Sequence, residues 1–356
     1  MKVNDLISIL EEIASPSLAE PDDSIGLQVG DPAAEVRSVA VALDPTPTAI
    51  RRAEEADILV AHHPIIHKPV ASIACGTQEG DAIYSAIKND LAVYVMHTNY
   101  DAARDGVNDA LAEALGLRET EVLSHHTRCK RYKIVVFVPE ESAEAVRDAM
   151  AEAGGGIIGL YSHCSFRGQG IGSFRPNKGA SPYVGSVGNL EEVSEWRLEM
   201  VVPEQSRDAV VRAMVSAHPY EEVAYDVYEL AEAENGYGFG RIGRIFPISA
   251  DDLLSMVKKN LRAPDTRYYG PRNAVFEKIA VCGGAGGGLI RETAATGAHV
   301  YITGDVGYHD LLLAEHLGLA IIDAGHRETE LPGMRKLAGR LRSRLRESAI
   351  EVRFLG

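Results

Sequence analysis

The amino-acid sequence predicts an α/β protein with mostly parallel sheets and helices outside them, into which a smaller α+β domain is inserted. Three observations predict this class. Short runs of β-branched residues alternate with helical segments in the first part of the 356-residue chain, and the alternation returns after residue 246. The segment in between carries an internal repeat instead. Strand–helix alternation with almost continuously apolar strands is typical of a covered, largely parallel sheet.

The first part of the chain begins with an amphipathic helix. Residues 1–14 (MKVNDLISILEEIA) place apolar side chains at helical spacing, with acidic residues between them. The helices and strands expected next follow one another in alternation. Strands are predicted at 37–43, 57–61 and 91–97, and helices at 46–55, 82–88 and 106–115.

The middle of the chain contains a repeat of a strand followed by a helix. Residues 132–153 (YKIVVFVPEESAEAVRDAMAEA) and 196–217 (WRLEMVVPEQSRDAVVRAMVSA) share Val-Pro-Glu after the strand and Ala-Val and Ala-Met in the helix. Strand-like sequence follows each repeat, at 156–161 and 223–230, and a glycine-rich hairpin or loop at 167–187 connects the halves. Two such β-α-β halves predict a ferredoxin-like sandwich, which we place at 128–232.

The α/β pattern resumes in the last part of the chain. Strands are predicted at 278–282, 300–303 and 319–323, helices at 309–317 and 334–345, and a glycine-rich loop at 283–288. The predicted organisation is therefore a first half of the α/β domain at 1–127, the inserted domain at 128–232, and the second half at 233–356. Such an insertion is tolerated because the ends of a domain often lie close together at its surface.

Charge and composition exclude several classes of function. The 36 basic and 51 acidic residues give a net charge of -15, which repels nucleic-acid phosphates, so no nucleic-acid partner is expected. No apolar run approaches the roughly 18 to 20 residues that span a membrane. Residues 1–14 lack the basic start and unbroken apolar run of a signal peptide. The four cysteines form no CxxC pair, which argues against a zinc ribbon. We expect a cytoplasmic protein without a membrane partner.

Two adjacent histidines, His62 and His63, follow the predicted strand at 57–61. They lie at the carboxyl end of a buried strand, where open α/β sheets place their ligands. Neighbouring residues of a strand point to opposite faces, but at the strand end the chain turns, so both imidazoles can serve one pocket. Alone, the pair is more often structural than metal-binding.

Asp101 occupies the corresponding position after the strand at 91–97. An Asp before a helix is commonly an N-cap, and that alternative stays open here. Against it, Asp101 precedes the helix predicted from residue 106 by several residues.

His326 and Glu330 lie four residues apart near the start of the last predicted helix. In a helix they would share one face, about 5 to 6 Å apart at Cβ, which lets an imidazole and a carboxylate hold one cation. A surface pair or a cap would show the same spacing. Pro332 is expected within the first helical turn, the position where proline is tolerated.

Together these motifs place three histidines and two carboxylates at three loops on the edge of one sheet domain. Two metal ions about 3.5 to 4 Å apart need about that many protein ligands. Imidazole and carboxylate ligands without thiolate suit zinc, iron or manganese. The sequence therefore predicts two divalent metal ions in each chain, with zinc expected first.

The motifs also resemble a known family. HHP at 62–64, HTNYD at 97–101, TGDVGYHD at 303–310 and DAGHRETE at 323–330 resemble the GTP cyclohydrolase I type 2 homologues, also called NIF-three-like proteins. DDSIGLQVGD at 22–31 and VALDPT at 41–46 match that family as well. The resemblance spans both halves of the α/β domain. It implies a dinuclear metal centre whose ligands would be His62, His63, Asp101, His326 and Glu330.

The same resemblance implies a fold for the insert, an assembly and an activity. The insert is similar to PII-like or CutA-like domains, and the family usually forms a homohexameric ring. The family name implies a metal-dependent hydrolase that opens a purine nucleotide ring, so a small molecule, such as a nucleotide, is the expected ligand. Two-metal chemistry itself favours a phosphoester as the alternative substrate. A non-enzymatic role as a metal-binding protein or a regulatory scaffold is the competing hypothesis.

Three further residues are candidates for catalytic roles. His97 could orient a ligand or contact substrate, or be a buried core histidine. Asp305 and His309 could transfer protons, although Asp305 could equally cap the following helix. Asp44 could hold a ligating imidazole or cap the helix after Pro45. For the glycine-rich loop at 283–288, close packing is favoured over phosphate binding, because the loop lacks the Lys-Ser/Thr of a P-loop.

Overall fold

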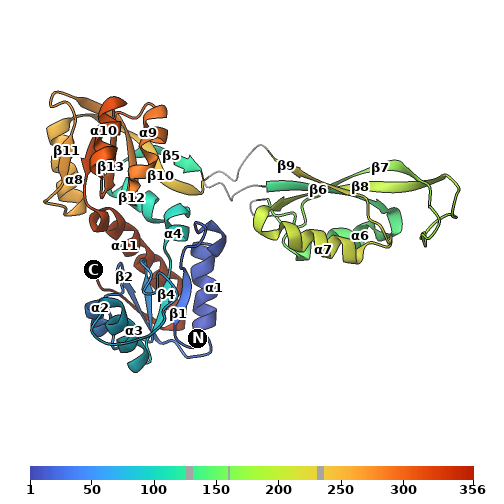
Figure 1. Cartoon of the computed structure of the whole chain (residues 1–356), viewed down its shortest axis with the longest axis horizontal. Coiled ribbons are helices and arrows are strands. Elements are labelled where there is room, and N and C mark those ends of the chain that lie inside the picture. The colour runs from blue at the N-terminus through green and yellow to red at the C-terminus, as the bar shows by residue number, and fades with distance from the viewer. Residues whose placement is uncertain (126–130, 159–160, 231–235) are drawn as a thin grey trace. The chain divides into compact units, whose positions relative to one another are not determined.

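The computed structural model describes residues 1–125, 131–158, 161–230 and 236–356. The chain divides into two compact units (Figure 1). Met1–His126 and Gly236–Gly356 form one unit, here called the split unit, and Thr127–Asn235 form the other, here called the middle unit. The predicted domain boundaries at 127/128 and 232/233 lie outside the described residues.

The first sheet of the split unit is largely parallel, as predicted. Its strand order is β1-β4-β3-β2-β15, and only the β1–β4 pair among these is antiparallel. The last strand of the chain pairs with β2, so both sequence segments contribute to this sheet. The strands are β1 (Gly26–Val29), β2 (Ser38–Ala42), β3 (Ile58–Ala61), β4 (Ala92–Val95) and β15 (Glu351–Phe354).

The second sheet of the split unit has the order β11-β14-β13-β12-β10-β5. Parallel pairing is confined to β12, β13 and β14, and the outer pairs are antiparallel, so the expectation of mostly parallel sheets is wrong here. Antiparallel neighbours need no crossover helix between them. Strands β5 and β10 come directly before and directly after the middle unit in the sequence, so that unit lies between them along the chain. The strands are β5 (Arg118–His125), β10 (Gly238–Ser249), β11 (Arg267–Tyr269), β12 (Val275–Ala285), β13 (Val300–Gly304) and β14 (Ala320–Asp323).

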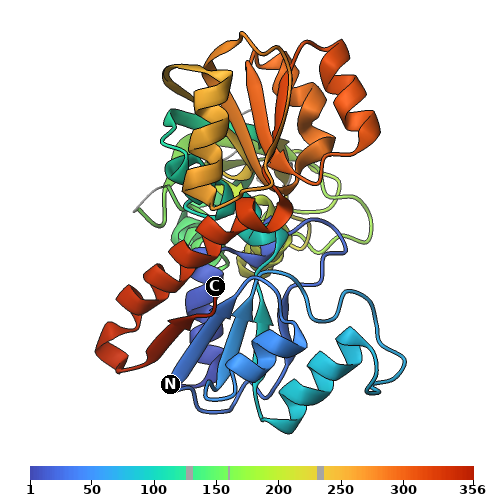
Figure 2. The same ribbon diagram turned by 90° about the vertical axis from the view of Figure 1, so that its left-hand side faces the viewer.

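Helices cover both sheets, and α11 lies between them (Figure 2). The split unit contains α1 (Val3–Ile13), α2 (Pro47–Arg52), α3 (Gln78–Lys88), α4 (Thr98–Ala102), α5 (Val107–Ala114), α8 (Ala250–Leu261), α9 (Ile290–Ala295), α10 (Tyr308–His316) and α11 (His326–Arg344). None of the described helices is long and apolar enough to cross a membrane.

Helix α11 begins at His326, beside the motif where its start was expected, and so extends the segment predicted at 334–345 toward the N-terminus. It differs from the prediction in one way: Pro332 lies inside it instead of in its first turn. Proline there removes one backbone hydrogen bond, a cost that tertiary packing must offset. That packing is close: a Cβ on Gly333 would lie 2.7 Å from the Cα of Val107 in α5. The Tyr100 hydroxyl of α4 also donates to the Gly333 carbonyl at 3.1 Å.

The glycine-rich stretch at 283–288 is only partly a loop. Its first half belongs to β12, and a 3-10 turn follows at Gly286–Leu289. The expectation of close packing is confirmed, because a Cβ on Gly284 would lie 2.4 Å from Oε1 of Glu330. The Gly284 N–H also donates to Thr329 Oγ1 at 3.0 Å. The bare backbone at this position therefore lets α11 bring Glu330 close to the sheet.

The middle unit follows the order β6-α6-β7-β8-α7-β9, with antiparallel strands arranged β7-β8-β6-β9. Its elements are β6 (Arg131–Pro139), α6 (Ala143–Glu152), β7 (Ser165–Phe174), β8 (Glu191–Pro203), α7 (Arg207–Ala217) and β9 (Tyr225–Glu229). The apolar core packs both helices on one face of the sheet.

The strand predicted at 156–161 is wrong. Its described residues hold only an isolated bridge between Ile158 and Tyr161. The second strand of the unit is β7, which overlaps the start of the stretch predicted as a hairpin or loop at 167–187 and pairs antiparallel with β8. Alternate glycines, Gly168, Gly170 and Gly172, remove the side-chain pattern by which a strand is recognised.

Candidate metal centre

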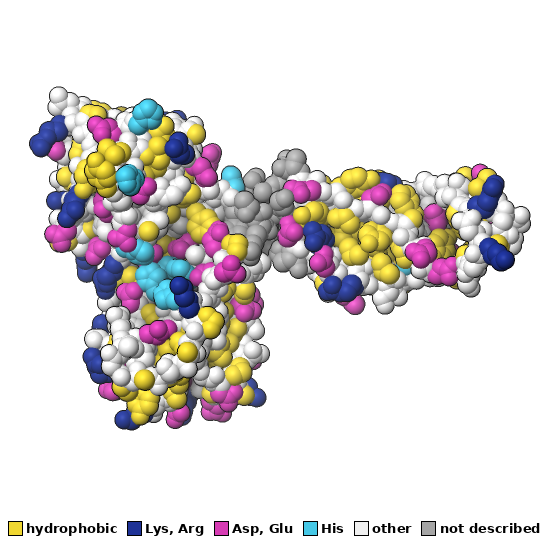
Figure 3. Space-filling model, in the orientation of Figure 1, with side chains coloured by type: hydrophobic (Ala, Val, Ile, Leu, Met, Phe, Trp, Pro, Cys, Tyr) yellow, Lys and Arg dark blue, Asp and Glu magenta, His cyan; other side chains and the backbone are white. Residues whose placement is uncertain are grey.

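Polar side chains gather where the strands of the first sheet end and α11 begins. His62 and His63 follow β3, Asp101 lies in α4 just after β4, and His326 and Glu330 occupy the first two turns of α11. Because β3 and β4 are parallel, their carboxyl ends meet at one edge of the sheet. A cluster of histidine side chains is visible on this face of the split unit (Figure 3). The structure thus brings all five predicted residues together.

The Glu330 carboxylate lies at the middle of the cluster, and its side chain is only 4% exposed. Its Oε1 is 3.1 Å from His326 Nε2, and its Oε2 is 3.2 Å from His63 Nε2. His62 Nε2 lies 3.6 Å from Oε1 of Glu330 and 3.5 Å from Oδ1 of Asp101. One carboxylate therefore faces three imidazoles, and a second carboxylate faces one of them.

Local structure explains two of these positions. His326 and Glu330 share a helix face because α11 begins at His326, which is the predicted i,i+4 arrangement. Asp101 is no N-cap, because it is the fourth residue of α4, whose N-cap is His97. The sequence reading missed this short helix, which carries the Asp101 side chain back toward the end of β3.

Each of these three histidines has its other ring nitrogen held by a neighbour outside the cluster. The Nδ1 atoms of His62, His63 and His326 hydrogen bond to the Met96 carbonyl at 2.8 Å, Asp44 Oδ1 at 2.7 Å and Asp305 Oδ2 at 2.8 Å. An acceptor at Nδ1 holds the proton there and leaves the Nε2 lone pair free for a cation. The imidazoles are therefore oriented before any cation binds.

Two of these outer partners resolve alternatives left open by the sequence. Asp44 holds His63, and the helix after it is capped by Thr46, whose Oγ1 accepts from the Ala49 N–H. Asp305 holds His326 and does not cap α10, where Asp310 accepts from the Gly307 N–H at 3.2 Å.

His309 stands apart from the cluster. It is exposed on α10, and its described ring contact is with Tyr308. The geometry therefore gives no support to a catalytic role for His309.

His97 also lies beside the cluster, and only part of its surroundings was predicted from the sequence. It is half-buried rather than in the core, and its ring lies 5.2 Å from that of His62 and 5.6 Å from that of His63. Its Nδ1 hydrogen bonds to Asp23 Oδ1 at 2.8 Å. Asp23 was missed as a site residue, although it lies in the DDSIGLQVGD stretch. Burial opposes its ionisation, but hydrogen bonds from His97 and Thr98 outweigh that effect and lower its pKa to about 2.

The donor atoms fit a cation. His62 Nε2, Asp101 Oδ1 and Glu330 Oε2 are shielded from solvent and have no hydrogen-bond partner among the described residues. Groups that could hold a metal ion are His62–Asp101–Glu330, His63–His326–Glu330 and His62–His63–His97. Buried polar atoms without partners are costly, and a cation placed between them would satisfy them.

The electrostatics of the cluster also favour positive charge. Burial disfavours a charged His63, but the hydrogen bond to Asp44 and the Glu330 carboxylate 3.2 Å away outweigh it and raise its pKa to about 10. The hydrogen bond to Glu330 raises the pKa of His326 to about 9. Burial opposes ionisation of Glu330, yet the three histidines hold its pKa well below the usual range. Burial raises the pKa of Asp101 to about 6. Protons on the imidazoles thus occupy positions that metal cations can take.

Comparison with known proteins places the chain in a family. The family described as Duf34/NIF3 (NGG1p interacting factor 3) matches residues 1–356. A Bacillus subtilis (strain 168) protein named GTP cyclohydrolase 1 type 2 homolog is 42% identical over 324 residues, covering 90% of this chain and 87% of its own length. A protein of the same name from Mycobacterium tuberculosis (strain ATCC 25618 / H37Rv) is 39% identical over 350 residues, covering 96% and 92%.

Solved structures agree with this assignment. The crystal structure of a Bacillus cereus protein related to NIF3 is similar with a TM-score of 0.80 and 39% identity, covering 99% of this chain and 96% of the other. A Staphylococcus aureus protein of known structure is similar over the same shares of the two chains, with a TM-score of 0.82 and 27% identity. The sequence match along the whole chain and the shared fold lead to one conclusion: this protein belongs to the Duf34/NIF3 family.

Proposed function

We propose that the cluster is a dinuclear metal centre and that the protein is a metal-dependent hydrolase. The observation that carries this proposal is the arrangement around Glu330. Three imidazoles held from outside direct their Nε2 atoms at one buried carboxylate, and three buried donor atoms lack any partner among the described residues.

Two overlapping groups of ligands support a pair of ions. His62 and Asp101 would hold one ion, His63 and His326 the other, and Glu330 would contribute to both. Two divalent ions supply Lewis acidity, which makes water a usable nucleophile near neutral pH and polarises the group under attack. Nitrogen and oxygen ligands without thiolate suit zinc, our first choice, and also iron or manganese.

A cavity of about 720 Å³ opens beside His63. Asp44, His63, His67 and Lys68 are among the residues that line it. Its volume lies within the range of roughly 300 to 1,000 Å³ that is usual for small-molecule sites. The Lys68 ammonium group could contact an anionic part of a substrate, such as a phosphate. His97, half-buried at the other side of the cluster, is the protein group we propose for proton transfer.

The substrate we propose is a purine nucleotide whose ring is opened by hydrolysis. The names of the relatives motivate this choice. The test is to incubate freshly purified protein with GTP and with a panel of phosphodiesters, and to separate the products chromatographically. Protein stripped with a chelator, protein reloaded with each metal, and the His326→Ala and Asp101→Ala variants serve as comparisons.

Each outcome of that test has a definite meaning. GTP turnover that disappears on stripping, returns on reloading and is lost in both variants supports the hydrolase. Full activity of the stripped protein would refute metal dependence. Turnover of a phosphodiester without turnover of GTP would make the protein a phosphoesterase. Stoichiometric metal without turnover of any substrate would favour the non-enzymatic metal-binding role.

The resemblance also leads us to propose a homohexamer, and a ferredoxin-like, PII-like insert at about 128–232. The order of elements in the middle unit and its antiparallel β7-β8-β6-β9 sheet support the proposed fold of the insert. Light scattering on the purified protein tests the assembly, and a mass other than that of six chains would exclude the hexamer.

A further inference from the structure

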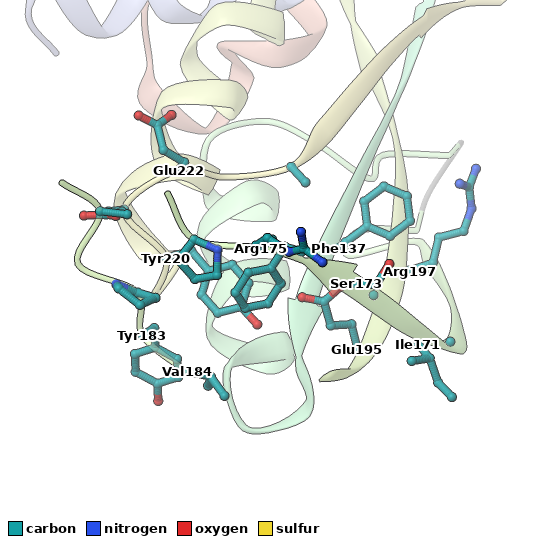
Figure 4. A pocket seen from close by; sticks show the side chains of 18 of the residues that line it. Phe137, Ile171, Ser173, Arg175, Tyr183, Val184, Glu195, Arg197, Tyr220 and Glu222 are labelled. Carbon is teal, nitrogen blue, oxygen red and sulfur yellow. The ribbon is translucent and has the colours of Figure 1, made fainter. Parts of the chain in front are cut away.

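The middle unit contains a cavity of its own, of about 770 Å³ (Figure 4). It lies on the face of the sheet opposite α6 and α7. Strand β7 and the segment after it form one side, Phe137 of β6 and Glu195 of β8 form the base, and Tyr220 closes the other side. Drug-sized ligands are usually bound in cavities of this order of size. None of these residues belongs to the metal cluster.

Part of one side of the cavity is bare backbone. Gly168 and Gly170 of β7 both line it, and a Cβ added to either would meet no atom within 4 Å. Packing within the chain therefore does not require glycine at these two positions. Glycine weakens a strand, and it often marks a place where a ligand or another backbone approaches closely. The alternation leaves a flat surface facing the cavity.

A buried carboxylate lies at the base of the cavity. Glu195 is 8% exposed, and no Lys, Arg or His nitrogen lies within 4.0 Å of it among the described residues. Gly172 covers it closely, since a Cβ there would lie 2.1 Å from Glu195 Oε2. The neighbouring Arg197 is paired with Glu199 at 2.8 Å. Burying a carboxylate away from water without a cation is costly.

His218 does not supply the missing charge. Its Nδ1 accepts a hydrogen bond from the Tyr220 N–H at 3.1 Å, so its Nε2 carries the proton and donates to the Phe137 carbonyl at 3.0 Å. That pattern is the neutral imidazole. Burial also lowers the pKa of His218. Two arginines, Arg175 and Arg197, also line the cavity, but neither guanidinium lies within 4.0 Å of the Glu195 carboxylate. Among the described residues, no group therefore supplies the counter-charge at that distance.

Aromatic rings stand beside the carboxylate. The Tyr220 ring lies 5.8 Å from that of Tyr183 and 6.3 Å from that of Phe174. The Tyr220 hydroxyl is shielded from solvent, and burial together with the adjacent Glu195 carboxylate raises the pKa of Tyr220. No acceptor meets full hydrogen-bond geometry around this hydroxyl among the described residues. Figure 4 shows Tyr220 and Glu195 directed into the same space. Aromatic faces attract cations, and this attraction strengthens away from water.

From these features we propose that the middle unit binds a planar organic cation of the guanidinium or amidinium class. The flat glycine surface and the tyrosine rings accept a planar group on its two faces. Two parallel N–H donors of such a cation match the two oxygens of the Glu195 carboxylate. Its charge offsets the unpaired carboxylate. This site is independent of the metal centre and of the reaction proposed there.

The test compares two isosteric probes on the full-length protein. Benzamidine is a planar cation with paired N–H donors, and benzamide is its neutral analogue. Calorimetric titration is expected to show saturable binding of one benzamidine per chain and at least tenfold weaker binding of benzamide. Glu195→Gln should weaken benzamidine binding at least tenfold. Gly170→Leu, which adds a side chain in open space, should abolish binding while leaving the melting temperature and the metal content unchanged.

The matched control is Glu192→Gln, which removes an exposed charge from the same strand outside the cavity and should bind benzamidine as the wild type does. Equal binding of the two probes, unchanged binding by Glu195→Gln, or no saturable binding at millimolar concentration would overturn the proposal. Binding that appears only in Arg175→Ala would overturn it too, since the chain's own arginine would then fill the site. Selective binding of guanosine in place of benzamidine would reject the cationic class.

Discussion

The two units bury a carboxylate in opposite ways. In the split unit, Glu330 is 4% exposed and faces three imidazoles, each held from behind by an acceptor. In the middle unit, Glu195 is 8% exposed and no described cationic side chain lies within 4.0 Å of it. The first carboxylate is surrounded by oriented imidazoles, and the second has no cationic side chain close to it among the described residues. The contrast shows that burial alone does not distinguish the two carboxylates; the outer hydrogen bonds that orient the imidazoles around Glu330 do.

The largest effect is expected from Glu330→Gln. This change removes the carboxylate shared by the two ligand groups, so both ions should be lost and metal affinity should fall by more than about 100-fold. Elemental analysis after gel filtration measures the loss. Glu328→Gln is the matched control, because it removes a charge two residues earlier in α11 without touching the cluster. Equal retention of metal by both variants would remove Glu330 from the centre.

A fully paired buried ion provides the next comparison. Arg241 is 3% exposed and binds Asp109 through two contacts of 2.7 Å. Asp109→Ala leaves the arginine without its partner and should lower the free energy of unfolding by about 3 kcal/mol. The exposed pair Arg244–Glu277 is the control, and Glu277→Ala should cost less than about 1 kcal/mol. Denaturant titrations with similar losses for both variants would contradict this difference.

Asp44→Ala tests the outer hydrogen bonds directly. Asp44 does not belong to any of the ligand groups, but it orients His63. Its loss should weaken metal binding roughly 10- to 100-fold without unfolding the protein. A competition titration against a chelator measures the affinity. An unchanged affinity would mean that the imidazole needs no such support.

The pH dependence should have opposite signs with and without metal. The raised pKa values of His63, about 10, and His326, about 9, mean that both are protonated at neutral pH in the metal-free protein. Metal must displace these protons, so its affinity should rise with pH between 6 and 8, about tenfold per unit for each proton released.

The metal-free protein should behave in the reverse manner. A raised pKa contributes stability that is fully present below the ordinary value of 6.5 and is lost as the pH rises through 9 and 10. Thermal melts of stripped protein at pH 6.5 and pH 10 measure this loss. Metal affinity that is flat between pH 6 and 8 would contradict the proton competition.

The smallest effect is expected from Glu195→Gln. This change removes a buried carboxylate that has no cationic side chain within 4.0 Å among the described residues. The free energy of unfolding should therefore change by less than about 1 kcal/mol or increase. The same substitution at Glu330 in stripped protein should destabilise, because it breaks contacts to three histidines. If Glu195→Gln destabilised the protein as strongly, Glu195 would have a partner within the fold.

Sequence patterns predicted the parts of the site that depend on local spacing. His62 and His63 adjoin a strand end, and His326 and Glu330 share a helix face. Their positions can therefore be predicted from the local sequence around them. Asp23 could not be found in this way, because it meets His97 across 74 positions of sequence. Such pairing depends on tertiary structure, and an Asp in a loop has no local pattern that marks it.

The fold shows the same difference between local and distant information. Parallel strands alternating with helices were predicted correctly where every strand is apolar, as in β3 and β4. The antiparallel pairs of the second sheet were not predicted, because pairing direction depends on connections between distant segments, such as β5 and β10. Strand β7 was predicted only as part of a hairpin or loop, because its alternate residues are glycines. In both places the information lies in tertiary contacts rather than in the local pattern.

The most direct test of the metal centre is anomalous X-ray diffraction from crystals of freshly purified protein, recorded at the zinc, iron and manganese edges. We predict two anomalous peaks in each chain, one bonded to His62 and Asp101, the other to His63 and His326, and both bonded to Glu330. No peak at this cluster in protein never exposed to a chelator, or peaks only elsewhere on the surface, would contradict the dinuclear centre.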